Sequence, residues 1–221
     1  MDLIRAKIWL RRIPGVLPLA RRVRGLKRSL IDSRRVRRYV EGAAVVKIVI
    51  GAASDRDEGW CSTDIEYLDL LDRSDWERYF GERKVDRLLA EHVWEHLSPA
   101  DGRRAAQMCF DYLVPGGTLR AAVPDGLHPD PEYIEYVDVG GEAGGSSPHK
   151  VLYDQKSFSE LFEAVGFEVR PLEYFDSSGE FHAVDWDLEG GVIKRSKRFD
   201  HRNVGGELKM TSVIVDAVKP R

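Results

Sequence analysis

The sequence is poor in cysteine, with only Cys61 and Cys109 among its 221 residues. Two cysteines cannot form a disulfide framework or a cysteine-rich metal site. Both lie in segments that we predict to be core or close to it, so we expect inert buried thiols. The fold must therefore be held by a hydrophobic core, which a chain of this length can build.

Long apolar runs are also missing from the sequence. Lys47 interrupts the best candidate for a membrane span, residues 43–53, whereas a spanning helix needs about 20 apolar residues. The start of the chain lacks the apolar centre of a signal peptide because four basic residues break it up. An organelle transit peptide is disfavoured by the few serines there. We therefore expect a cytoplasmic protein.

Acidic residues are scarce in one part of the chain. Residues 1–40 hold thirteen Lys and Arg but only two acids, whereas the remainder holds 21 basic and 35 acidic residues, and the formal net charge of −3 hides this asymmetry. Such a block of charge usually marks an arm with its own partner. We therefore expect a basic arm, residues 1–40, and one domain, residues 41–221.

Two basic helices are predicted for the arm, residues 2–13 and 19–40, because prolines begin and end the five residues between them. Apolar residues with 4-3-4 spacing form a stripe on the second helix: Leu19, Val23, Leu26 and Leu30. A basic amphipathic helix can lie on anionic lipid, so the arm could hold the protein at the inner face of the membrane. Alternatively, these helices pack against the domain and cap its cleft, or they bind nucleic acid or a partner protein.

A strand–helix–strand unit is predicted over residues 84–125. Residues 84–90 suit a buried parallel strand, Ser98 and Pro99 suit a helix start, and 118–123 form the next apolar strand after Pro115-Gly116-Gly117. In such sheets the ligand binds beyond the carboxyl ends of the strands. Those ends carry three polar residues, which we predict to lie at the site: Glu91, His92 and Asp125.

Further elements follow from apolar spacing and turn residues. We predict strands at 45–50, 167–175 and 210–218, and helices at 74–80, 132–137 and 156–165. Residues 67–70 form either a short strand or a loop, 140–147 form a glycine-rich lid, and 176–206 are irregular and anchored by Trp186 and Phe199. No internal repeat is visible.

The central letters, LLAEHVWEHLSPADGRRA and YLVPGGTLRAAVPD, resemble class I S-adenosylmethionine-dependent methyltransferases, in particular a small bacterial group associated with carbohydrate and cell-surface pathways. The similarity extends over about residues 45–220. It implies an α/β fold, Rossmann-like and doubly wound, with a mainly parallel sheet that ends in a C-terminal antiparallel strand pair. It also implies S-adenosylmethionine as the cofactor.

The loop after the first strand departs from the usual G-x-G-x-G pattern, because only Gly51 remains, followed by Ala52 and Ala53. The helix that usually follows is missing, which disfavours a nicotinamide cofactor with its pyrophosphate. Asp64 can bind both ribose hydroxyls or can simply cap a turn. The predicted cofactor-binding residues are Gly51, Ala52, Ala53, Trp60, Asp64, Asp69, Leu70, Glu91 and His92.

The histidines allow several interpretations. His92, Glu95 and His96 match H-x-x-E-H, a zinc-hydrolase motif, but they directly follow a predicted strand. In a methyltransferase, a histidine suits the general base, with His149 on the lid, His92 and His128 as candidates. We expect His96 to point away as a capping or core residue. The predicted catalytic residues are His149, His92 and Asp125, and Glu91, Asp125 and His149 are a possible Mg²⁺ site.

The sequence thus predicts an O-methyltransferase acting on a sugar or glycan hydroxyl, the acceptor being implied by the resemblance alone. A small-molecule acid or phenol and an N-methyl acceptor stay open. A non-catalytic scaffold is the alternative, supported by the degraded glycine loop. We expect no nucleic-acid acceptor, because the acidic domain would repel phosphate.

Overall fold

The computed structural model describes residues 33–52, 58–144 and 148–221. The first arm helix, the apolar stripe of the second, Ala53 and part of the predicted lid lie outside these ranges. The arm's lipid contact and the domain boundary at residue 40 therefore stay predictions. None of the helices in the described ranges has the length and apolar character needed to cross a membrane.

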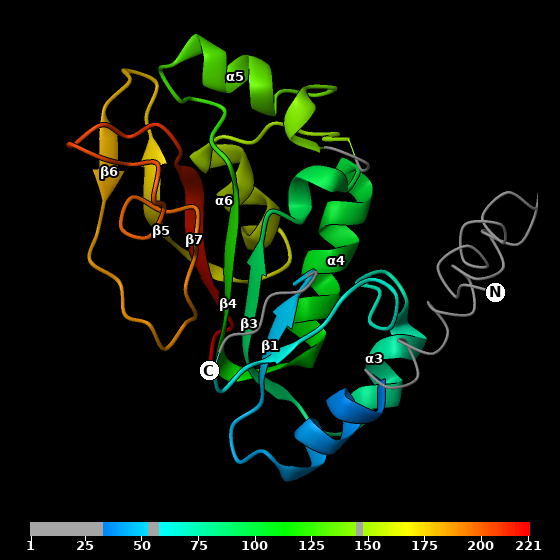
Figure 1. Ribbon diagram of the computed structural model, residues 1–221. Helices are drawn as coiled ribbons and strands as arrows, with labels where there is room; N and C mark the ends of the chain where they lie inside the picture. Colours follow the sequence, from blue (N-terminus) through cyan, green and yellow to red (C-terminus); the bar gives the residue numbers. More distant parts are fainter. Residues whose placement is uncertain (1–32, 53–57, 145–147) are drawn as a thin grey trace, which may run out of the picture.

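A seven-stranded sheet with the order β2-β1-β3-β4-β7-β5-β6 forms the centre of the molecule (Figure 1). Strands β2, β1, β3 and β4 are parallel, whereas β7 runs antiparallel to both β4 and β5. This is the mainly parallel sheet with a C-terminal antiparallel pair that the resemblance implies, so the predicted fold class is confirmed. The bounds are β1 Lys47–Ile50, β2 Cys61–Ser62, β3 Val85–Glu91, β4 Leu113–Pro124, β5 Glu168–Phe175, β6 Phe181–Ala183 and β7 Ser212–Val218.

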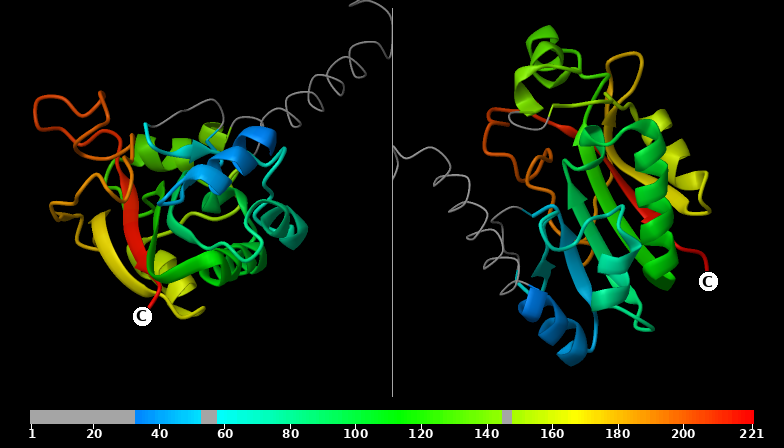
Figure 2. Two further views of the ribbon diagram at one scale, coloured as in Figure 1. Left: turned by 90° about the horizontal axis from the view of Figure 1, so that it is seen from below. Right: turned by 90° about the vertical axis from the view of Figure 1, so that its right-hand side faces the viewer.

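Alternating residues of the strands build two cores, one on each face of the sheet. Ile48, Leu88 and Val215 belong to the larger core, which also contains helices α3, α4 and α6. Leu89 and Ile214 belong to the smaller one, which is completed by the irregular segment 184–211. Figure 2 shows α4 and α6 on one side of the sheet and this segment, in orange, on the other. The helices are α3 Arg73–Tyr79, η1 Trp94–His96, α4 Pro99–Tyr112, α5 Pro131–Val137, η2 Glu142–Gly144 and α6 Gln155–Glu163.

The helices begin at side chains that satisfy their free N–H groups. Ser98 accepts a hydrogen bond from the Asp101 amide at the start of α4, as its sequence predicts. Asp130 caps α5 in the same way, and Asp154 forms a capping box with Ser157 at α6. The helix predicted at 74–80 begins one residue earlier, because Asp72 rather than Ser74 is its N-cap.

Residues 67–70 form a loop, the second of the two predicted alternatives, since the Tyr67 and Leu68 amides donate to the Asp64 carbonyl in a turn. The Pro115-Gly116-Gly117 run does not end the preceding helix, which stops at Tyr112; it lies within the irregular start of β4. Gly116 adopts φ 79° there, and its N–H donates to the Lys219 carbonyl.

The end of the predicted arm packs against the domain. Residues 33–42 are helical, and Val36 and Val40 are buried in the larger core. The Tyr79 hydroxyl donates to Ser33 Oγ at 2.7 Å, and the Arg35 guanidinium donates to the Ser62 carbonyl. The last turns of the arm therefore pack against α3 and the end of β2, which agrees with the packing alternative for this part.

Segment 184–211 is attached to the sheet by Arg120, a β4 residue that is 1% exposed. Its guanidinium donates two hydrogen bonds to the Asp216 carboxylate, each 2.8 Å long. It donates two more to the carbonyls of Asp187 and Gly191, at 2.7 and 2.8 Å. The ring of Trp186 lies 4.7 Å from its centre. This buried cation therefore satisfies backbone groups that the irregular segment cannot satisfy itself.

The segment lies so close to the sheet that side chains are excluded at two positions. A Cβ atom on Gly190 would lie 2.5 Å from the Arg120 Cζ. A Cβ atom on Gly191, where φ is 98°, would lie 2.7 Å from a methyl group of Leu89. Glycine is needed at both positions for the guanidinium and the β3 side chain to reach the segment.

Arg120→Met should lower the free energy of unfolding by about 3–5 kcal/mol, because it leaves the Asp216 carboxylate and two carbonyls without their donor. Urea denaturation measures the change. The matched control is Arg104→Met, which removes an exposed ion pair with Asp101 and should cost at most about 1 kcal/mol. Equal losses in the two variants would contradict the anchoring role of Arg120.

Candidate active site

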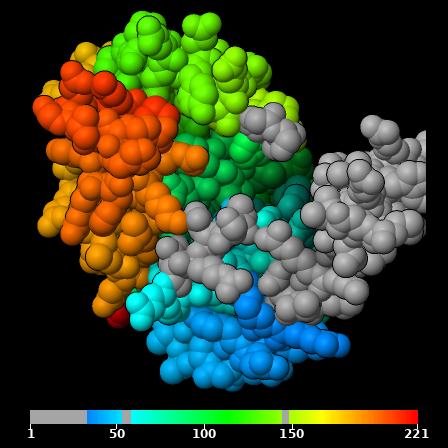
Figure 3. Space-filling model, in the orientation of Figure 1, coloured from blue at the N-terminus to red at the C-terminus, as the bar shows by residue number. Residues whose placement is uncertain are grey.

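A cavity of about 420 Å³ lies at the carboxyl ends of β1, β3 and β4. The space-filling view shows a recess here between segment 184–211, in orange, and the residues around α5 (Figure 3). Its position is the one expected for a ligand in a sheet of this type. The lining comprises Val49, Ile50, Gly51, Ala52, Leu89, Glu91, His92, Glu95, His96, Pro124, Tyr133, Tyr136, Val137, Ala143, His149, Val192, Lys194, Arg195, Arg202, Met210 and Thr211.

Gly51 and Ala52 form the part of the wall that follows β1. Gly51 has φ 64°, and a Cβ atom there would lie 2.8 Å from Val93 Cγ2. Glycine therefore fits both the left-handed backbone and the close approach of Val93. The Ala52 N–H donates to the Thr63 carbonyl, which holds the loop against the end of β2. Gly51 and Ala52, two of the residues predicted to bind the cofactor, thus line the cavity.

Glu91 lines the cavity, but its carboxylate already has partners. It accepts hydrogen bonds from the backbone N–H groups of Lys194 and Arg195, at 3.1 and 2.7 Å. The sequence predicts a cofactor ligand here, whereas the structure uses the carboxylate to fasten segment 184–211 to the end of β3. Glu91 therefore shapes the wall of the cavity.

His92 follows β3 with φ 56°, a left-handed backbone rare for a residue with a side chain. Its Nε2 lies 3.1 Å from Ser212 Oγ, which itself donates to the Arg195 carbonyl. Because that hydroxyl proton is committed, Nε2 must be the donor to Ser212. The other ring nitrogen, Nδ1, lies 3.1 Å from Oε1 of Glu95. Nε2 of His92 therefore has a hydrogen-bond partner, whereas Nδ1 lies beside the Glu95 carboxylate.

His96 and His149 face one another across the cavity wall, with ring centroids 5.0 Å apart. His149 is 4% exposed, and its Nδ1 lies 2.6 Å from the Val137 carbonyl, to which it donates. His96 Nδ1 lies 3.5 Å from the Pro148 carbonyl. The prediction that His96 points away from the site is wrong, because η1 is one short 3-10 turn that directs it to the cavity.

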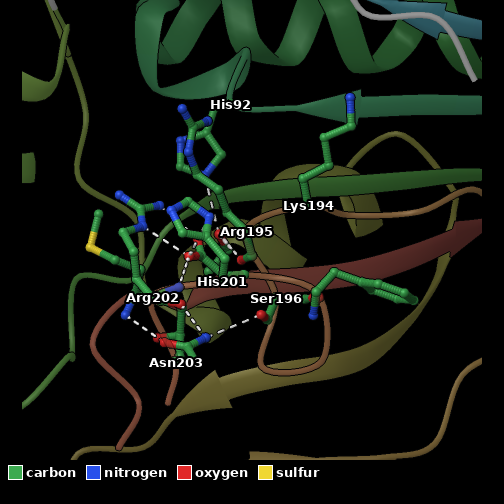
Figure 4. A network of polar contacts seen from close by, with 12 residues as sticks. His92, Lys194, Arg195, Ser196, His201, Arg202 and Asn203 are labelled. Carbon is green, nitrogen blue, oxygen red and sulfur yellow. Dashed lines mark hydrogen bonds and ion pairs between the residues drawn. The ribbon is translucent and has the colours of Figure 1, made fainter.

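Segment 184–211 adds three basic residues to the wall, Lys194, Arg195 and Arg202. Figure 4 shows His92, Arg195, Arg202 and Asn203 gathered in one network, from which Lys194 extends away. Arg202 donates to both oxygens of Asp200, at 2.8 and 2.6 Å, and these bonds raise its pKa. These three residues are not among those predicted from the sequence. Their signal there is the basic run 194–202 inside an otherwise acidic domain.

Asp125 and His128 are structural residues, which corrects their predicted catalytic roles. Asp125 is fully buried and accepts hydrogen bonds from the Leu127 and Phe175 amides, at 3.0 and 2.7 Å. His128 uses one ring nitrogen toward the Leu208 carbonyl and the other toward the Asp130 amide. Neither residue lines the cavity.

The remaining predicted cofactor residues lie outside the cavity lining. Asp64 follows β2, and its carboxylate accepts from the Ile65 amide at 2.8 Å, so it caps a turn. Asp69 caps the next turn through the Leu71 amide, and Leu70 is part of the larger core. Trp60 packs against the smaller core, with the Lys47 ammonium 5.8 Å from its ring.

The residues predicted for a Mg²⁺ site do not form one. The carboxylates of Glu91 and Asp125 accept hydrogen bonds from backbone N–H groups. Their oxygens do not form a cluster of possible ligand atoms with His149. Within the described ranges, two other groups bring at least three ligand atoms within 4.8 Å of one another: Glu95, His96 and His149, and Asp176, Glu180 and His182.

No family model matches the chain, and no curated protein sequence matches it. Among solved structures, a methyltransferase dependent on S-adenosylmethionine from Archaeoglobus fulgidus matches with 14% identity and a TM-score of 0.45, over 86% of this chain and 94% of that one. One from Mesorhizobium loti matches with 12% identity and a TM-score of 0.48, over 81% and 99%. Human N-acetylserotonin methyltransferase, in complex with S-adenosylmethionine, matches with 8% identity and a TM-score of 0.42, over 82% and 42%. With TM-scores below 0.5, these similarities carry no argument about the site.

The buried Asp125 carboxyl should give stability a pH dependence of unusual sign. Burial raises its pKa from 3.8 to about 6, so the folded chain holds this proton more tightly than the unfolded chain. Its contribution to stability is therefore full below about pH 4 and is lost as the pH rises through about 6. Urea denaturation from pH 4 to 7 should show the wild type losing about 2–3 kcal/mol relative to Asp125→Asn.

Asp72→Asn is the matched control for this measurement. Asp72 is an exposed N-cap whose pKa is lowered by its hydrogen bonds with Ser74. Its contribution is lost only as the pH falls below about 4, so the difference between wild type and Asp72→Asn should stay nearly flat from pH 4 to 7. A flat difference between wild type and Asp125→Asn would contradict the raised pKa.

Proposed function

We propose that the protein is an S-adenosylmethionine-dependent methyltransferase that methylates a hydroxyl group. The observation that carries the proposal is the position of the cavity. It lies at the carboxyl ends of β1 and β3, beside the loop of Gly51 and Ala52. In this sheet β7 lies between β4 and β5 and is antiparallel to both. A sheet of this kind binds its ligand at that edge. A cavity of about 420 Å³ has the size of a small-molecule site.

The cofactor would extend from the cavity toward the end of β2, where Asp64 and Asp69 follow the strand. One Asp64 oxygen caps its turn, and its second oxygen can accept from a ribose hydroxyl. S-adenosylmethionine has no pyrophosphate, so the missing helix after β1 removes nothing that it needs. When bound, it supplies a methyl group on a sulfonium centre that is open to displacement in line.

The residues of the cavity can align an acceptor and remove its proton. His149 donates through Nδ1 to the Val137 carbonyl, so its neutral ring presents an unprotonated Nε2. An imidazole in this form can take the proton of an attacking hydroxyl. His92 has Nε2 hydrogen-bonded to Ser212 and Nδ1 beside Glu95, so it is suited to fix the wall. The burial of His149 also keeps water from the proton acceptor.

The acceptor that we propose is a sugar or glycan hydroxyl, the class implied by the resemblance of the sequence. Lys194 and Arg195 give this wall positive charge, whereas Asp200 balances that of Arg202. Such a wall suits an acceptor that also carries an anionic group. The surrounding domain is acidic, which disfavours long polyanions such as nucleic acids.

Two alternatives are weighed against this proposal. A non-catalytic scaffold is favoured by the partners that Glu91 and Asp64 already have. The H-x-x-E-H hydrolase needs His92 and His96 on one face of a continuous helix. Here η1 begins after His92, whose ring is directed to Ser212, so that alternative loses its geometric basis.

Asp64→Ala should weaken binding of S-adenosylhomocysteine, the methyl-transfer product, by about 1–3 kcal/mol, because ribose hydroxyls lose their acceptor. Isothermal titration calorimetry measures this change. Glu82→Ala is the matched control, since it removes the same charge before the start of β3, at the opposite edge of the sheet. Unchanged affinity in folded Asp64→Ala would remove Asp64 from the site, and no binding to wild type would favour the scaffold.

His149→Gln should lower kcat by about 10²–10⁴, the usual effect of losing a general base, while cofactor affinity stays close to wild type. Methyl transfer to a panel of uronic and neutral sugars, followed with labelled S-adenosylmethionine, gives the rates. His201→Gln, at a histidine whose side chain is 92% exposed, is the control. A His149→Gln enzyme that keeps its kcat and the basic limb of its pH profile would refute the role.

A further inference from the structure

The Glu95 carboxylate is an unusual feature of the cavity wall. Glu95 is 0% exposed, and neither of its carboxylate oxygens has a hydrogen-bond partner among the described residues. Oε1 lies 3.1 Å from His92 Nδ1, but this contact lacks the geometry of a hydrogen bond. A buried carboxylate without donors is costly, because it loses its water and gains nothing in return. A cation at this position would compensate it.

Two histidines present ring nitrogens to the same place. One ligand atom each from Glu95, His96 and His149 lies within 4.8 Å of the other two. His149 Nδ1 donates to the Val137 carbonyl and His96 Nδ1 faces the Pro148 carbonyl. In its neutral form, a ring that donates through Nδ1 carries no proton on Nε2, so both rings can offer Nε2 as a ligand. A histidine that donates its other N–H to a backbone carbonyl is the usual arrangement of a metal ligand.

Hydrogen bonds between the two segments fix the three side chains relative to one another. The Glu95 carbonyl accepts from the amides of Lys150 and Val151, at 2.7 and 3.3 Å. These bonds join η1 to the residues that directly follow His149. The ligand-bearing segments, 53 residues apart in the sequence, are thus held together by backbone contacts that do not involve the ligand atoms.

We infer that Glu95, His96 and His149 bind a divalent first-row transition-metal ion. Ligands at about 2.1 Å from one ion lie at most about 4.2 Å apart, so small side-chain rotations close the site. Two imidazoles with one carboxylate suit zinc, iron, cobalt or manganese, whereas Mg²⁺ prefers oxygen ligands alone. All three residues line the cavity, so coordination positions stay open toward it.

This inference extends beyond methyl transfer and does not rest on it. A bound ion would occupy His149 Nε2, the atom otherwise available as the base. Its charge would lower the pKa of a coordinated acceptor hydroxyl, so that activation of the acceptor passes from the histidine to the metal. The ion and the cofactor use different residues, and their binding can be measured separately.

The second cluster, Asp176, Glu180 and His182, is the competing location. It lies on the β5–β6 hairpin and is more exposed. Asp176 already accepts from Ser178 and from the His182 ring, at 2.6 Å each. Since these contacts satisfy its carboxylate, the hairpin lacks the unpartnered buried ligand that distinguishes the cavity.

The test is calorimetric titration of the chelator-treated full chain with Zn²⁺, and absorption spectroscopy with Co²⁺. Wild type should bind one Zn²⁺, show d–d bands with Co²⁺ and gain thermal stability with either ion. Glu95→Gln, His96→Gln and His149→Gln should each lower Zn²⁺ affinity by more than about 100-fold, since loss of an outer-shell partner alone costs 10–100-fold. His182→Gln and His201→Gln should bind as wild type does.

Several outcomes would overturn the site. These are no Zn²⁺ binding by wild type, binding that the three cavity variants leave intact, and binding lost in His182→Gln. Thermal unfolding without metal shows whether each variant is folded; Glu95→Gln, which removes a buried unpaired charge, should be at least as stable as wild type. A chain that binds S-adenosylhomocysteine but not Zn²⁺ refutes this inference alone, and the reverse result refutes the proposed cofactor alone.

Discussion

The cavity depends on three buried or half-buried side chains that hydrogen-bond to an irregular segment. Segment 184–211 has no strand or helix beside the sheet to satisfy its backbone, so side chains of the sheet must do so. Arg120 of β4 donates to two of its carbonyls, and Glu91 of β3 accepts from two of its amides. Glu173 of β5 accepts from the Lys197 amide and the Trp186 indole. Three strands thus hold the wall that carries the basic residues.

This arrangement explains why the acidic residues at the strand ends hold the backbone, although the sequence predicts that they bind a ligand. Glu91 and Asp125 both follow strands, where a ligand is expected. Both are consumed by backbone N–H groups, Glu91 by segment 184–211 and Asp125 by the Phe175 amide on β5. Besides the Glu95 carboxylate, the cavity therefore presents imidazole, guanidinium and ammonium groups to a ligand, although the domain as a whole is acidic.

The sequence predicts the fold well because the relevant signals are local. Ser98 before Pro99, and the apolar runs of the strands, act within a few residues, and the resemblance supplies the mainly parallel sheet with its C-terminal antiparallel pair. The site is predicted less well because its contacts join distant positions. Glu91 meets Arg195, 104 residues away, and His96 meets His149, and no local pattern encodes either contact. In the sequence, Glu95 belongs only to the disfavoured H-x-x-E-H pattern, whereas in the structure a 3-10 turn buries it in the cavity wall.

The charge of Glu95 links the two chemical roles considered for the cavity. With the Ser212 hydroxyl donated to the Arg195 carbonyl, His92 Nε2 must carry a proton. A neutral His92 would then turn a lone pair toward the Glu95 carboxylate at 3.1 Å, and the two acceptors would repel each other. A second proton, on His92 Nδ1 or on Glu95, removes that repulsion. The metal ion proposed for Glu95, His96 and His149 would weaken it by drawing charge from the carboxylate. A proton and this metal would thus compensate the same buried charge, and the metal would occupy the nitrogen with which His149 is proposed to act as a base.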